Sequence, residues 1–103
     1  MNYAILWSEA GGPVIAGKVE LRNGCLIFDG TNGTRRRFAL ALADVVSVRI
    51  ARGPGDRLQG RPVLLLDTGQ GDVRVATLNG TGALHELADL IQPGRIGVEA
   101  VRP

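Results

Sequence analysis

The sequence has few residues that could cross-link the chain or hold a metal. Its 103 residues include one cysteine, Cys25, and one histidine, His85. A single cysteine cannot form an internal disulfide, and these two residues together cannot supply the three or four ligands of a zinc site. The sequence therefore predicts no disulfide, no zinc and no other cofactor.

Long hydrophobic runs are also missing. The apolar run Val63 to Leu66 is far shorter than the roughly 20 residues that span a bilayer. The N-terminus lacks the basic flank and long apolar region of a signal peptide. We therefore expect no transmembrane segment and a cytoplasmic location.

The charges nearly cancel. Twelve lysines and arginines against ten acidic residues leave a net charge of +2, which is too small to predict a nucleic-acid partner by itself. With 45% hydrophobic and 21% charged residues, the composition is that of a folded chain rather than a disordered one. The length predicts one domain over residues 1–92, with residues 93–103 as a C-terminal tail.

Alternating apolar and polar residues are the main pattern that is present, and they predict β-strands. Asn23-Gly24 lies between two such segments and is a strong hairpin signal. The segment at residues 35–42 also fits a short helix, but the short loops around it favour a strand. The predicted strands cover residues 3–8, 15–22, 25–29, 35–42, 45–52, 61–67 and 72–78.

A helical period occurs only near the end, where Leu84, Leu87, Ala88 and Ile91 recur on one side. This pattern predicts an amphipathic helix over residues 82–92 that covers the core. Tyr3, Ile5 and Trp7 are expected in the core as well. The other inward side chains expected are Val19, Leu21, Leu26, Phe28, Phe38, Leu40, Val46, Val48 and Ile50.

Seven short strands followed by one amphipathic helix resemble the pleckstrin-homology-like superfold, in particular its GRAM and bacterial branches. The segments that carry the resemblance are Gly17–Leu21, Leu26–Phe28 and Leu42–Val48, the last of which contains Asp44. The resemblance implies a barrel of two near-orthogonal antiparallel sheets, capped at one end by the helix. It also implies bacterial relatives that assemble into oligomers, but no activity, since fold alone does not fix function.

Two arginine clusters are the candidate anion contacts. Arg35, Arg36 and Arg37 adjoin the third predicted inter-strand loop, and Arg52, Arg57 and Arg61 border the fifth and longest. Phosphoinositide-binding members of the superfold use cations on the first and third loops. Here the first loop, residues 8–13, has Glu9 and no cation, and recognition of a polyphosphate needs several convergent donors. The sequence therefore disfavours a specific phosphoinositide and a nucleic acid, and solvated arginines are the simpler interpretation.

Catalytic patterns are weak. His85 and Asp89 can meet on one helical turn, but neither serine of the chain, Ser8 or Ser47, lies in a nucleophile motif. The carboxylates of Asp67 and Asp72 flank a hairpin turn, which lacks the cleft that a catalytic or metal-binding pair needs. We therefore expect no enzymatic activity.

The run Val63–Leu66 is apolar on both faces of its strand, so its outer face needs a cover. Two covers are open: the tail, in which Ile96, Val98 and Ala100 alternate, or a partner chain. The expected surface, called here the outer patch, consists of Val45, Ala51, Val63, Leu65 and Ala76.

The sequence thus predicts a non-catalytic interaction module that contacts a protein partner or itself, as a homo-oligomer, through a sheet face or edge. The alternative function is an anion binder, of lipid head groups or nucleic acid, that uses the two arginine clusters.

Overall fold

The computed structural model describes residues 2–30 and 37–91. They form seven strands, one short 3-10 helix and one α-helix, in agreement with the predicted mainly β class. Arg35, Arg36 and the tail at residues 93–103 lie outside the described residues. The elements are β1 (Asn2–Glu9), β2 (Ile15–Arg22), β3 (Cys25–Gly30), β4 (Arg37–Ala41), η1 (Leu42–Asp44), β5 (Val45–Ala51), β6 (Val63–Thr68), β7 (Gly71–Thr77) and α1 (Thr81–Ile91).

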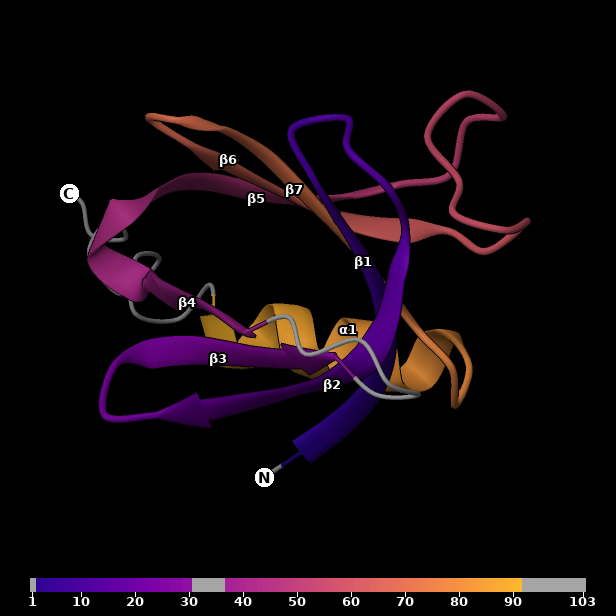
Figure 1. The fold of residues 1–103 in the computed structure, drawn as a ribbon. Helices are drawn as coiled ribbons and strands as arrows, with labels where there is room; N and C mark the ends of the chain where they lie inside the picture. The colour runs from indigo at the N-terminus through magenta and orange to yellow at the C-terminus, as the bar shows by residue number, and fades with distance from the viewer. Residues whose placement is uncertain (1, 31–36, 92–103) are drawn as a thin grey trace, which may run out of the picture.

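All seven strands belong to one antiparallel sheet in the order β4-β3-β2-β1-β7-β6-β5. The sheet curls on itself, and α1 lies across one side of the curl (Figure 1). The helix packs against β5, β6 and β7. β4 and β5 are the two ends of the sheet, so the curled sheet stays open between them.

Two of the predicted turns, after β1 and after β2, contain residues with positive φ. Asn23 and Gly24 have φ of 51° and 77°, which makes the hairpin between β2 and β3 the expected tight turn. The chain from β1 to β2 turns in the same way through Ala10 and Gly11, with φ of 48° and 77°. The glycines therefore predicted the positions of both turns. Nothing in the sequence indicated that Ala10 would adopt a positive φ.

The inner face of the sheet holds the main core. Three of the four aromatic residues stack in a row, with ring centroids 5.3 Å apart from Trp7 to Phe28 and again from Phe28 to Phe38. Trp7 and Phe28 are fully buried, and Tyr3 and Ile5 are buried as predicted. The apolar stripe of α1, which is Leu84, Leu87, Ala88 and Ile91, closes this core and is also buried as predicted.

The inward prediction is wrong for Val46, which is 68% exposed. A β-bulge is the reason: Val45 pairs with Thr68 and Ser47 with Asp67, so Val46 is an extra residue on β5. The bulge places Val45 inward, in the main core, and leaves Val46 in solvent. Beyond the bulge, Val48 and Ile50 pack against the core as expected.

A second, smaller cluster covers the outer face of the sheet. Its members come from β1, β5, β6, β7 and the long loop at residues 52–62, and they are Leu6, Ala51, Leu58, Val63 and Ala76. Leu58 is held by a tight turn, because it exchanges backbone hydrogen bonds of 3.1 and 3.0 Å with Arg61. The loop therefore covers part of this face through Leu58, whereas the sequence suggested only the tail or a partner chain as a cover.

We expect Leu58→Ala to destabilise the protein by about 2 kcal/mol, the low end for a buried leucine, because the cluster is small. Urea unfolding followed by Trp7 fluorescence measures this loss. A change below about 0.5 kcal/mol, as for an ordinary surface substitution, would mean that the loop is not docked on the sheet.

Helix α1 is tied to β1 by a polar contact. The Tyr3 hydroxyl donates a hydrogen bond of 2.8 Å to Oε1 of Glu86. Burial, and then the bond and charge of Glu86, raise the pKa of Tyr3 from 10.0 to about 12. The fold therefore favours the protonated hydroxyl.

Stability is expected to fall in alkali as this hydroxyl loses its proton. Because the pKa of Tyr3 is higher in the folded chain, its contribution is complete below pH 10 and is lost as the pH rises through about 12. Tyr3 is the only tyrosine, so ultraviolet absorbance of the tyrosinate reports it directly. In Glu86→Gln the pKa of Tyr3 should move part of the way back, because burial remains. An unshifted pKa in the parent chain would contradict the contact.

Candidate partner-binding groove

A groove of about 460 Å³ lies at the open side of the sheet. We call it the edge groove. β4 and the turn between β6 and β7 form its two sides, both on the left of Figure 1. The residues that line it are Glu9, Ala10, Phe38, Ala39, Leu40, Asp44, Val46, Thr68, Gly69, Gln70, Gly71, Asp72 and Val73.

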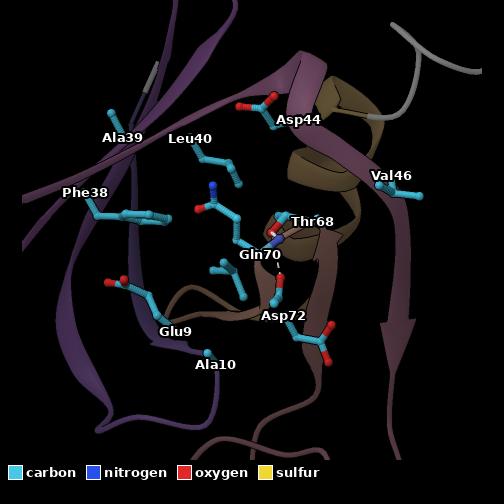
Figure 2. Close-up of a pocket in the computed structure, with 13 residues that line it drawn as sticks. Glu9, Ala10, Phe38, Ala39, Leu40, Asp44, Val46, Thr68, Gln70 and Asp72 are labelled. Atoms are coloured by element: carbon cyan, nitrogen blue, oxygen red, sulfur yellow. Dashed lines mark hydrogen bonds between the residues drawn. The ribbon is translucent and has the colours of Figure 1, made fainter.

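Apolar side chains form one side of the edge groove. Leu40 and Val73 are buried, and the half-buried ring of Phe38 is the outer end of the aromatic row. Figure 2 shows Phe38 and Leu40 on one side and Thr68 and Gln70 across from them. The exposed Val46, which the bulge turns outward, adds an apolar side chain to the rim.

Short turns fix the polar side of the groove. Thr68 accepts a hydrogen bond of 3.1 Å from the amide of Gln70 and donates one of 2.7 Å to the carbonyl of Gly71. The turn after β1 packs alongside, because the Ala10 amide donates to the Asp72 carbonyl at 2.7 Å. Both turns are therefore held in place before any ligand arrives.

In the part of the chain that the structure describes, the charged residues that line the groove are all acidic: Glu9, Asp44 and Asp72. Asp44 and Asp72 are exposed, and the half-buried Glu9 accepts a hydrogen bond of 3.2 Å from the indole N–H of Trp7. Figure 2 places Asp44 and Glu9 near opposite ends of the opening. Within residues 2–30 and 37–91, no three acidic, histidine or cysteine side chains are close enough to hold a metal ion. The negative charge is therefore spread along the groove.

β4 also has a free backbone edge. The amide of Leu42 donates to the carbonyl of Gly24 at 2.9 Å, and this contact sets which residues face β3. Backbone groups alternate sides along an antiparallel strand, so those of Leu40 also face β3 and those of Ala39 and Ala41 face away. In the described part of the chain, no strand pairs with that outer edge.

The predicted arginine contacts are partly used within the fold. Arg57 donates to the carbonyls of Arg52 and Gly60 at 3.1 and 2.9 Å, so it holds the loop at residues 52–62 together. The Arg52 guanidinium lies 3.2 Å from Nε2 of His85 on α1. Arg61 is exposed beside the start of α1, and Arg37 lies 3.5 Å from Asp29. Three of the candidate arginines, Arg37, Arg52 and Arg57, therefore already have polar contacts within the fold.

The five residues of the outer patch are all buried, between 0% and 8% exposed. Val45 faces the main core, and Ala51, Val63 and Ala76 belong to the cluster under Leu58. Leu65 lies between Arg49 and Arg74 on the neighbouring strands, whose aliphatic stems can cover it. The expected exposure of this patch is therefore wrong. The bulge turns Val45 into the main core, Leu58 of the long loop packs on three of the other residues, and Leu65 lies between two arginines.

The candidate catalytic residues fall into separate groups: Ser8 on β1, the pair His85 and Asp89 on α1, and Ser47, Asp67 and Asp72, which are cross-strand neighbours on β5, β6 and β7. Ser8 is buried and donates to the carbonyl of Gly12 at 2.8 Å, whereas His85 and Asp89 are exposed on α1. Ser47, Asp67 and Asp72 are exposed near the ends of β5, β6 and β7, and Cys25 is half-buried at the start of β3.

Within the described ranges, no helix has both the length and the apolar character that a membrane span requires.

Sequence reasoning missed the edge groove, although it had singled out several of its residues. The sequence places Asp44 in a segment that carries the family resemblance, Asp72 beside a hairpin turn, and Phe38 and Leu40 in the core. The available signal was that Glu9, Asp44 and Asp72 each lie at or beside the end of a strand. Only the curl of the sheet brings those ends to one opening.

The comparisons with known proteins give a fold and no function. No family model matches the sequence, and no curated protein matches it. A solved structure is similar, described as the C-terminal domain of an unknown protein from Leishmania infantum. It is 13% identical, with a TM-score of 0.66 over 88% of this chain and 81% of that chain. The likeness supports the arrangement of strands and helix.

Proposed function

We propose that this chain is a non-catalytic interaction module of pleckstrin-homology-like fold, and that it contacts a protein partner through the edge groove. The proposal includes the capped barrel of two near-orthogonal halves and the cytoplasmic location that the sequence suggested. The order of seven strands and one terminal helix supports the resemblance.

One observation carries the proposal: an apolar groove lies beside a strand edge that no described strand covers. Free strand edges pair readily with other chains, and concave apolar surfaces are where partners gain contact area. The acidic lining disfavours the anion-binding alternative at this place, because phosphate groups would meet carboxylates there.

Photo-cross-linking tests this function at defined positions. A photoreactive amino acid replaces Gln70 in the edge groove, and in a matched variant it replaces Gln59 in the loop at residues 52–62. Both glutamines are exposed and lie in tight turns, so the two variants differ mainly in location. The chain is irradiated in cells of its source, and the adducts are identified by mass spectrometry.

We expect a protein adduct, a partner or a second copy, at position 70 and none at position 59. Adducts at position 59 alone, or adducts with lipid or nucleic acid instead of protein, would contradict the proposal. They would direct attention to the arginines of the long loop.

A further inference from the structure

The edge groove combines three features that together define a kind of ligand. It has a strand edge that no described strand pairs with, apolar side chains inside and acidic residues along its length. Resting on the proposed function, we propose that the partner contributes an extended segment that carries lysine or arginine and pairs with β4 as an added strand.

The backbone of β4 is suited to this pairing. Ala39 directs its N–H and C=O to the open edge, and its side chain is exposed and small. Neither Ala39 nor Ala41 has a side chain large enough to shield the backbone, and neither is a proline, which natural proteins use to block an edge. An incoming strand can therefore form main-chain hydrogen bonds with β4.

The interior of the groove selects the alternate side chains of that strand. Successive side chains of a strand point to opposite faces, so every second one would enter the groove beside Phe38 and Leu40. Those two residues and Val73 offer apolar contact, which favours aliphatic side chains at the inward positions.

The acidic residues of the groove favour basic side chains at the other positions of the partner's segment. Among the described residues, the groove is lined by Glu9, Asp44 and Asp72 and by no lysine or arginine, so a basic segment finds opposite charge along its path. Because the carboxylates are spread out and do not converge on one point, an elongated cation matches them better than a metal ion does. An acidic segment, or a nucleic acid, would be repelled.

The probe for the test is a short acetylated peptide that alternates valine with lysine, and its matched control has glutamate in place of lysine. Both peptides carry the same fluorescent label, and their binding to the full chain is measured by fluorescence anisotropy at low salt. Trp7 gives a second readout, since it is the only tryptophan and its indole N–H bonds to Glu9 of the groove.

We expect the lysine peptide to bind at least about tenfold more tightly than the glutamate peptide. The double variant Asp44→Asn/Asp72→Asn should bind the lysine peptide about tenfold more weakly, because each lost carboxylate removes roughly one charge interaction with the peptide. Asp56→Asn is the control for a lost negative charge. Asp56 lies in the long loop, which extends away from β4 in Figure 1, so its loss should leave the affinity unchanged.

A second pair of variants tests the strand pairing itself. Ala39→Pro removes an edge N–H that does not pair with β3, so the fold should survive, as circular dichroism can check. We expect this variant to lose about tenfold or more in affinity for the lysine peptide, whereas Ala39→Val keeps the N–H and should retain at least part of the binding.

Three results would overturn the inference: equal binding of the two peptides, unchanged binding by folded Ala39→Pro, or a dimer in sedimentation that Ala39→Pro converts to monomer. The last result would make a second copy the occupant of the edge. If cross-linking from position 70 captures a protein while the lysine peptide fails to bind, the inference fails and the proposed function stands. If both fail, the groove is not a partner site.

Discussion

Replacing Gly17 with alanine is expected to destabilise the fold by more than about 4 kcal/mol, which places it among the exceptional single substitutions. An added Cβ at this position would lie 2.0 Å from the carbonyl oxygen of Asp29 and 2.9 Å from the Cα of Gly30. Both are backbone atoms of β3, the strand paired with β2, so no side chain can move aside. A typical domain has a total stability of about 5–15 kcal/mol, so this substitution should remove a large share of the free energy of unfolding.

Gly82→Ala is the matched control. It makes the same chemical change near the start of α1, where a Cβ would meet nothing within 4 Å. Alanine favours a helix over glycine, so this variant should be neutral or more stable by up to about 1 kcal/mol. Urea unfolding monitored by Trp7 fluorescence compares the two. A Gly17→Ala protein as stable as the parent would show that β2 and β3 do not approach so closely.

Leu87→Ala should have the second largest effect, a loss of about 2–5 kcal/mol. Leu87 is 2% exposed and is part of the stripe that seals the core between α1 and the sheet. Truncation removes buried methyl groups and leaves a cavity that the curled sheet cannot readily close. Urea unfolding of the parent and variant chains measures the difference.

Leu78→Ala is the control for this experiment, because Leu78 follows β7 and is 39% exposed. We expect a change within about 0.5 kcal/mol there. If Leu87→Ala cost no more than Leu78→Ala, the helix would not be docked on the sheet, and the main core would lack its cover.

Local patterns in this sequence predicted its elements well because local physics decides them. Alternation defined β2 over the bounds that the structure shows, and the helical stripe placed α1 within one residue. The turn at Asn23-Gly24 followed from the backbone freedom of its residues. The bulge at Val46 was not predictable in this way, because the extra residue is itself apolar and therefore continues the alternation of Val48 and Ile50.

The groove and the cover of the outer patch depend on distant contacts. Leu58 was placed in a loop and given no role, yet its turn folds it against Val63 and Ala76. Asp44 and Asp72 are far apart in the sequence, and they line one groove only because the sheet curls. Sequence reasoning therefore placed the possible partner contact on residues that are buried, and a charged site on arginines that the fold partly uses for itself.

If a partner adds a strand to β4 in the edge groove, amide hydrogen exchange measured by NMR should detect the new main-chain hydrogen bonds. We predict that the Ala39 amide exchanges rapidly in the free chain, because it faces the open edge, and becomes protected when the valine–lysine peptide is added. The amides of the loop at residues 52–62 should keep their exchange rates. If Ala39 exchanges equally fast with saturating peptide, or if protection appears only in that loop, strand addition to β4 is contradicted.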